Sequence, residues 1–195
     1  MRINPIKTVS VKSNYNVFVG DYPFHQTLQS ELLPLLEDHP DEQNRKTNVK
    51  ATMTNWKWQV DNPKIKRLLL YVEATVKNCY DYKVIGEMAP KMYWGNFWAN
   101  VYRKGDYTQS HDHYTSVSIF SFVYFLKAKW YDSPLVFTSS GQKIRPKEGR
   151  YILFPSHLQH RVPKHRYNDT RITLSGNIND LRAISYYVQG GVAPR

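Results

Sequence analysis

The segment VSIFSFVYFL, residues 117–126, decides how this chain is expected to fold. When it is extended, apolar side chains occupy both of its faces, which is typical of a strand buried on both sides. Shorter strand-like runs surround it, separated by turn residues, and they cover residues 94–102, 134–138, 151–154, 160–163, 170–178 and 183–188. Many short strands in succession predict a mainly β fold, a β-sandwich or jelly roll, over about residues 91–189.

The first 90 residues are expected to form a helical front with supporting strands behind this β region. Residues 24–37 predict a helix in which Pro34 indicates a kink or an end. Asp61-Asn62-Pro63 is typical of a helix start, because a capping side chain stands just before a proline. The helix that follows, over about residues 62–80, carries its apolar residues on one stripe. The segment 38–58 is polar and irregular, so we expect no regular element there.

The composition indicates one packed domain over residues 1–195, with a loose tail at 190–195. A hydrophobic fraction of 41% and an aromatic fraction of 14% are ample for a core. Cys79 is the one cysteine, which excludes an internal disulfide and a cysteine-based zinc cluster. Neither a signal peptide nor an apolar run long enough to cross a membrane is evident. We therefore expect a cytoplasmic protein without a membrane partner.

The net charge of +11 favours anionic partners, such as nucleic acid, an acidic protein or small acids. The segment 143–166 contributes seven Lys and Arg against one Glu. The charge is not accompanied by a nucleic-acid-binding motif, so a solvated basic surface explains it equally well. The charge therefore does not name a substrate.

Three histidines form a candidate metal site. His111 and His113 stand two apart, so both point to the same face of a regular strand, and His160 begins a later extended run. Two histidines and a carboxylate are the usual ligands of a non-haem iron oxygenase, and here the carboxylate position reads as histidine. A bulge that turns Asp112 onto the metal and releases His113 is the rival assignment. We expect His157 and His165 to stay outside the site, and His165 to be solvent-exposed.

An arginine on the next strand suggests an acid-binding site beside the metal. Arg171 and Thr173 share a strand face with Ser175. A buried guanidinium binds a carboxylate in a bidentate fashion, and without such a partner it is costly to bury. Tyr102 and Tyr124 flank the histidines on strands, where each phenol could line a cavity. Ordinary packing is the alternative for either tyrosine, and an outward orientation is the alternative for Arg171.

The order of these motifs resembles one known family. The segments PKEGRYILFPS at 146–156, HRV at 160–162 and RITLSGN at 171–177 follow the histidine pair in turn. This order resembles the 2-oxoglutarate/Fe(II) oxygenase superfamily, in its prolyl-4-hydroxylase-like branch. Within that branch the chain is most similar to oxygenases that carry His-x-His in place of His-x-Asp. The resemblance covers roughly residues 93–178.

The resemblance implies a double-stranded β-helix, or jelly roll, that holds iron at one mouth. His111, His113 and His160 would be the Fe(II) ligands, and Arg171 would bind the far carboxylate of the cosubstrate 2-oxoglutarate. Tyr124, Tyr102 and Thr173 would contact the cosubstrate as well. The implied activity is that of a dioxygenase that consumes O₂ and 2-oxoglutarate and hydroxylates a substrate, with a peptide or protein favoured.

The substitution of a histidine for the carboxylate has a physical consequence. Three neutral histidines leave an Fe(II) site with a charge of +2, where the usual set leaves +1. Dianionic 2-oxoglutarate is then attracted more strongly, but neutral imidazoles also suit other divalent metals. Two alternatives therefore stay open: a three-histidine metal oxygenase that does not use 2-oxoglutarate, and a catalytically silent jelly-roll binding module. Nucleic acids and free metabolites also stay open as substrates.

Overall fold

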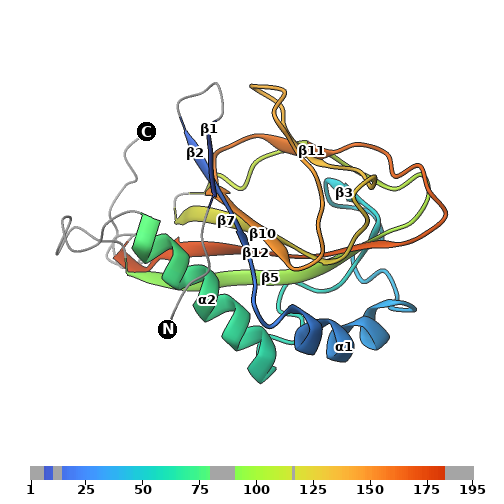
Figure 1. The fold of residues 1–195 in the computed structure, drawn as a ribbon, viewed down its shortest axis with the longest axis horizontal. Helices are drawn as coiled ribbons and strands as arrows, with labels where there is room; N and C mark the ends of the chain where they lie inside the picture. Colours follow the sequence, from blue (N-terminus) through green and yellow to red (C-terminus); the bar gives the residue numbers. More distant parts are fainter. Residues whose placement is uncertain (1–6, 11–14, 80–90, 116, 183–195) are drawn as a thin grey trace.

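The fold is described from a computed structural model, which covers residues 7–10, 15–79, 91–115 and 117–182. Two antiparallel sheets face each other as a jelly roll (Figure 1). The larger sheet has the order β1-β2-β10-β7-β12-β5-β4, with bounds β1 Lys7–Ser10, β2 Asn16–Asp21, β4 Thr52–Met53, β5 Met92–Tyr102, β7 Ser118–Lys127, β10 Arg150–Pro155 and β12 Arg171–Asp180. The smaller sheet has the order β3-β6-β11-β8-β9, with bounds β3 Val49–Lys50, β6 Tyr107–His111, β8 Leu135–Phe137, β9 Lys143–Ile144 and β11 His160–Val162.

The strand β7 lies in the middle of the larger sheet, between β10 and β12, and is almost entirely buried. Its alternate residues join two different apolar clusters. Phe122 and Tyr124 pack toward the helices, whereas Val123 and Phe125 pack between the two sheets. The prediction that this segment is apolar on both faces is therefore confirmed, and the reason is that each face meets its own core.

Two helices cover the outer face of the larger sheet. They are α1, His25–Leu36, and α2, Pro63–Cys79, and Figure 1 shows both on the side away from β3 and β11. Asn62 caps the start of α2, because its Oδ1 accepts hydrogen bonds from the backbone N–H groups of Lys64 and Ile65 at 2.9 and 3.4 Å. None of the described helices is long and apolar enough to cross a membrane.

The sequence predicted both helices and most strands correctly. Pro34 lies inside α1 and does not end it, since the helix continues to Leu36. Leu28, Leu32 and Leu36 form the buried face of this helix. The segment 38–58 was expected to be irregular, but it contributes β3 and β4, each of two residues and held by a longer neighbour. The predicted strand 183–188 and tail 190–195 lie outside the described residues, and the single domain stays a prediction.

Candidate active site

Three histidine rings meet where β6 and β11 lie side by side. His111 ends β6, His160 begins β11, and the two are direct cross-strand partners. The ring centroids are 4.4 Å apart for His111 and His160, 4.9 Å for His111 and His113, and 5.1 Å for His113 and His160. One ring nitrogen from each histidine lies within 4.8 Å of the other two. This spacing is compatible with three ligands on one face of a single metal ion.

Backbone carbonyls fix the orientation of two of these rings. His111 Nδ1 lies 2.9 Å from the carbonyl oxygen of Gln109, and His160 Nδ1 lies 2.8 Å from that of Leu158. Because a carbonyl oxygen only accepts, each Nδ1 carries the proton and donates it. In both residues the lone pair is therefore left on Nε2, as a metal ligand requires.

His113 joins the cluster from the loop that follows β6, because the regular strand ends at His111. Its backbone N–H donates to the carbonyl oxygen of Ser156 at 2.8 Å, which holds the loop against the end of β10. Asp112 is exposed, and its Oδ1 accepts a hydrogen bond from the backbone N–H of Tyr114 at 3.0 Å. The structure thus brings His113 to the cluster and leaves Asp112 in a local turn, which does not favour the rival assignment.

All three imidazoles are held in their neutral form. Burial lowers the pKa of His111, although the hydrogen bond to Gln109 opposes this effect. Burial and the neighbouring His111 lower the pKa of His113 to about 3. Burial, together with both other histidines, brings the pKa of His160 well below its ordinary value. Neutral imidazole is the protonation state that binds a metal, so the cluster needs no deprotonation near neutral pH.

A ladder of polar residues leads from the histidines into the space between the sheets. The strands β12 and β5 pair so that Ser175 lies opposite Trp98, Thr173 opposite Asn100, and Arg171 opposite Tyr102, and all six line one cavity with the three histidines. The amide nitrogen of Asn100 lies 3.4 Å from Thr173 Oγ1 and 3.3 Å from Ser175 Oγ, as a donor to both. The three histidines and these polar groups therefore share one cavity.

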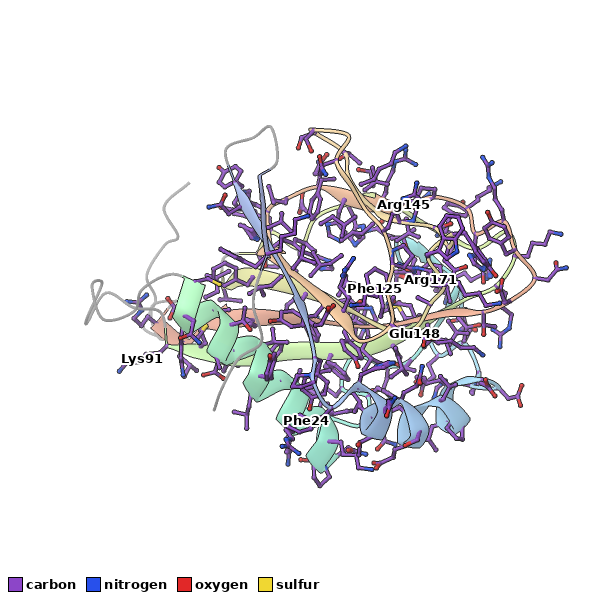
Figure 2. All side chains as sticks on the ribbon, in the orientation of Figure 1. Phe24, Lys91, Phe125, Arg145, Glu148 and Arg171 are labelled. Atoms are coloured by element: carbon purple, nitrogen blue, oxygen red, sulfur yellow. The ribbon has the colours of Figure 1, made fainter. Side chains whose placement is uncertain are left out.

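Arg171 lies inside this cavity without a salt bridge to any described carboxylate. Its side chain is 1% exposed, and none of its three guanidinium nitrogens has a hydrogen-bonding partner among the described residues. The guanidinium carbon is 4.6 Å from the ring centroid of Tyr102 and 5.2 Å from that of Phe125, which Figure 2 shows beside it within the sheets. Burial lowers the pKa of Arg171, and the neighbouring Tyr102 and Asp132 oppose this effect. A buried and unpaired cation is costly, and a bound carboxylate would remove that cost.

Of the two tyrosines expected in the cavity, only one is there. Tyr102 lines it, with its phenol hydrogen-bonded to Thr108 Oγ1 at 2.7 Å. Tyr124 lies on the opposite face of the sheet, in the helix-side cluster, where its phenol is 2.7 Å from His25 Nδ1. The prediction that Tyr124 contacts a cosubstrate in the cavity is wrong, because the pleat of β7 turns it toward α1.

Trp98, Asn100 and Thr108 also line the cavity, and none of them was among the residues predicted from the sequence. Trp98 and Asn100 stand four and two positions before Tyr102 on the same strand, so they share its face. This period of two was a usable signal. Thr108 follows the turn at Gly105, and its position facing Tyr102 depends on the fold of that turn.

The two other histidines of this region stay outside the cluster, as predicted, but His165 is buried rather than exposed. Its Nε2 lies 2.7 Å from the backbone carbonyl of Asp169. Together with the carboxylates of Asp132 and Asp169, it forms a second group of possible metal ligands. The ammonium of Lys129 already binds Asp169 Oδ2 at 2.6 Å. Lys129 therefore already supplies a positive charge to one of the two carboxylates of this group.

The residues fit the Fe(II) and 2-oxoglutarate that the motifs imply. Three neutral nitrogen donors on one side of a metal leave positions open for oxygen ligands, and imidazole suits iron. A dianionic diacid would find the metal at one end and the unpaired Arg171 at the other. The buried hydroxyls of Tyr102, Thr108 and Thr173 line the same cavity as that arginine and can bond a carboxylate.

The sequence of the core decides the family. Residues 97–179 match the sequence profile of the 2OG-Fe(II) oxygenase superfamily. The core of this chain belongs to that superfamily. The matched segment contains the three histidines and Arg171. The oxygenase is a 2-oxoglutarate- and Fe(II)-dependent enzyme. A comparison of the oxygenase sequence with curated proteins found no match.

Solved structures share the fold of the oxygenase. A prolyl-4-hydroxylase from Pseudomonas putida is 14% identical, with 86% of this chain and 94% of that chain covered and a TM-score of 0.63. The viral collagen prolyl hydroxylase of Paramecium bursaria Chlorella virus-1, in complex with 2OG, is 15% identical, with 78% and 91% covered and a TM-score of 0.55. HygX from Streptomyces hygroscopicus, with nickel and 2-oxoglutarate bound, is 10% identical, with 85% and 83% covered and a TM-score of 0.60.

Proposed function

We propose that this oxygenase hydroxylates a peptide or protein, with His111, His113 and His160 as Fe(II) ligands and Arg171 as the anchor of 2-oxoglutarate. One observation carries the proposal: a fully buried arginine without a salt bridge to a described carboxylate shares a cavity with three neutral imidazoles. The cavity therefore offers a dianion two complementary sites, one at each end. Tyr102 and Thr173 stand beside Arg171 and are proposed to bond the same carboxylate.

Fe(II), 2-oxoglutarate and O₂, when bound, supply an oxidant that inserts oxygen into an unactivated C–H bond. The role of the chain's own residues is to bind the metal and 2-oxoglutarate and to orient the groups that hold them. The carbonyls of Gln109 and Leu158 hold two imidazoles with their lone pairs available, and Trp98 packs 5.7 Å from the ring of His113. The aromatic rings around His160, Phe154 at 4.8 Å and Phe137 at 6.5 Å, limit the access of water from the inner side.

The proposed peptide substrate is supported by the surface next to the histidines. A second hollow adjoins His111 and His113 and is lined by Met53, Trp56 and Trp98. Trp56 is 40% exposed, and its ring centroid lies 4.9 Å from that of Trp98. An exposed aromatic wall suits an apolar side chain of a peptide. Two of the similar structures are described as prolyl hydroxylases, which agrees with this class of substrate.

The basic surface suggests that acidic residues flank the substrate site. Lys143, Arg145, Arg161 and Arg166 are exposed within the segment 143–166. An acidic peptide, rather than a nucleic acid, would place an apolar side chain in the aromatic hollow and acidic side chains against the basic surface. We place the enzyme in the cytoplasm, in line with its single cysteine.

The lack of a carboxylate among the three ligands favours one competing function, a three-histidine oxygenase that does not use 2-oxoglutarate. Such an enzyme has no need for a buried acid anchor, so Arg171 separates the two functions. A silent binding module is the third reading, and metal affinity separates it from both.

The test is succinate formation from 2-oxoglutarate with Fe(II), ascorbate and O₂, measured with panels of acidic and neutral peptides, oligonucleotides and metabolites. We expect turnover to rise with an acidic peptide. Arg171→Leu should abolish the rise, and Arg67→Leu, at an exposed arginine on α2 outside the basic segment, should keep it. Peptide oxidation without succinate would support the three-histidine alternative. Absence of metal binding would support the silent module.

A further inference from the structure

The third histidine is oriented by a side chain rather than by a backbone carbonyl. Asn177 lies on β12 at the same face as Arg171 and Ser175, and it is 7% exposed. One end of its amide lies 3.4 Å from His113 Nδ1, and the other accepts a hydrogen bond from Ser121 Oγ at 2.7 Å. Asn177 therefore bridges a proposed metal ligand and the interior of the larger sheet.

The direction of this bridge decides whether His113 can bind a metal through Nε2. If the amide nitrogen of Asn177 donates to Nδ1, the imidazole proton must sit on Nε2, and Nε2 has no lone pair for a metal. If the amide is turned over, Nδ1 donates to Oδ1, and Nε2 is free to coordinate. The oxygen and nitrogen of an amide are nearly equal in shape, so both orientations fit the same space.

We propose that Asn177 is a positioning residue that holds His113 in its metal-binding tautomer by accepting the Nδ1 proton on Oδ1. This inference rests on the proposed function, in which His113 is an Fe(II) ligand. Asn177 then does for His113 what the carbonyls of Gln109 and Leu158 do for the other two histidines. In all three imidazoles a neutral oxygen then accepts the proton of Nδ1, and Nε2 is left free to bind a metal.

A chain of serine hydroxyls can satisfy the hydrogen bonds of the turned-over amide. Ser121 Oγ lies 3.1 Å from Ser156 Oγ, which lies 3.2 Å from Ser118 Oγ. A hydroxyl both donates and accepts, so the chain can run in either direction. With the amide turned over, Asn177 Nδ2 donates a hydrogen bond to Ser121 Oγ. Each serine hydroxyl then donates a hydrogen bond to the next one in the chain. Ser156 also fixes the backbone of His113 through its carbonyl, so the same segment holds both the loop and the ring.

The proposal has a consequence for the charge of the site. A neutral amide keeps the three-histidine site at its full positive charge, whereas a carboxylate at position 177 would place a negative charge behind His113. The variant Asn177→Asp keeps the shape and an obligate acceptor, and Asn177→Leu keeps the volume but has no acceptor. The pair separates hydrogen bonding from packing. Asn179→Leu is the control, since Asn179 is buried on the same strand and face but donates to Tyr93.

The first experiment measures the affinity for Zn(II) or Co(II) alone, by competition with a chromophoric chelator. We expect Asn177→Leu to weaken binding by about 10- to 100-fold, the usual effect of losing a partner of a metal-bound histidine. Asn177→Asp should bind at least as tightly as the parent, and Asn179→Leu should stay within about threefold of it. Equal affinity of the parent and Asn177→Leu would overturn the proposal, as would a matching loss in Asn179→Leu.

The second experiment reads the tautomer by ¹⁵N NMR of the histidine rings in the Zn(II)-loaded protein. We expect His113 to show a protonated Nδ1 and a metal-bound Nε2 in the parent and in Asn177→Asp. Coordination through Nδ1 would overturn the role of Asn177 but keep His113 as a ligand. A parent protein without metal affinity, or a His113→Ala variant that binds as well as the parent, would instead overturn the ligand set of the proposed function.

Discussion

The two faces of β12 are opposite in character, although both are buried. The face toward the smaller sheet is polar and carries Arg171, Thr173, Ser175 and Asn177, while the face toward the helices is apolar and carries Ile172, Leu174 and Ile178. The helix-side face contributes to the larger apolar cluster with α1 and α2. The inner face instead contributes hydrogen-bonding groups, and in Arg171 these have no partner among the described residues.

This difference indicates that one face of β12 mainly stabilises the fold, whereas the other face mainly contributes groups for ligand binding. Apolar burial against the helices stabilises the fold, since each buried aliphatic side chain contributes about 1.5–3 kcal/mol. Unpaired polar groups between the sheets destabilise the ligand-free protein and are stabilised when a ligand binds. Inner-face substitutions should therefore change binding, and outer-face substitutions should change unfolding. The following predictions test that division.

The largest expected effect is the acid sensitivity of the metal-free protein. Burial lowers the pKa of His111, His113 and His160, so below about pH 6.5 the unfolded chain binds protons that the folded protein does not. The free energy of unfolding should fall as the pH drops, by up to about 1.4 kcal/mol per pH unit for each histidine, or about 4 for all three. Urea unfolding at pH 5.0–7.5 measures this slope.

A triple variant with glutamine at the three positions should have a flatter slope. His157→Gln, at an exposed histidine, should keep the slope of the parent. A slope that does not change in the triple variant would contradict the neutral, buried state of the cluster.

On the outer face, Leu174→Ala should lower the free energy of unfolding by about 4 kcal/mol, within the range for a fully buried leucine. Its side chain packs in the helix-side cluster and does not line the cavity. The affinity for 2-oxoglutarate should therefore change little in the folded variant. Chemical denaturation and calorimetry measure the two quantities, and a large loss of affinity would show that the faces are coupled.

On the inner face, Arg171→Leu should weaken 2-oxoglutarate binding by about 2–4 kcal/mol, the scale for losing a desolvated charged pair. It should not lower the stability of the ligand-free protein, because it removes a buried, unpaired charge. Metal affinity should stay nearly intact. Arg171→Lys should recover only part of the loss, since an ammonium lacks the planar fork. Anaerobic calorimetry with an inert divalent ion gives the affinity, and an unchanged value in the leucine variant would contradict the anchor role.

The smallest expected effect is that of Tyr124→Phe, which removes the hydrogen bond to His25 on the outer face. We expect a loss of about 1 kcal/mol in the free energy of unfolding, the usual contribution of one such bond. The apparent affinity for 2-oxoglutarate should not change. Tyr102→Phe is the matched inner-face variant, and it should weaken that affinity while Tyr124→Phe does not.

Local sequence patterns predict the two helices, most of the strands and part of the cavity lining. The apolar run 117–126, the stripe of α2 and the period of two along β12 are local patterns, because a pleat or a helix turn follows from neighbouring residues. The spacing of His111, His113, His160 and Arg171 predicted their association, and the structure brings them to one cavity. Parity along β12 likewise predicted that Thr173 and Ser175 accompany Arg171.

The face that each strand turns inward, and the partner that each polar group meets, depend on the packing of the whole molecule. Both faces of β7 are apolar, so its sequence could not tell that Tyr124 faces α1 and not the cavity. His165 sits in a polar segment, but its backbone pairs with the distant Gly105 and Asp106, and its side chain is buried. The bond between Asn177 and His113 joins residues 64 positions apart. Such contacts depend on strand order and register, which are set by the packing of the whole molecule.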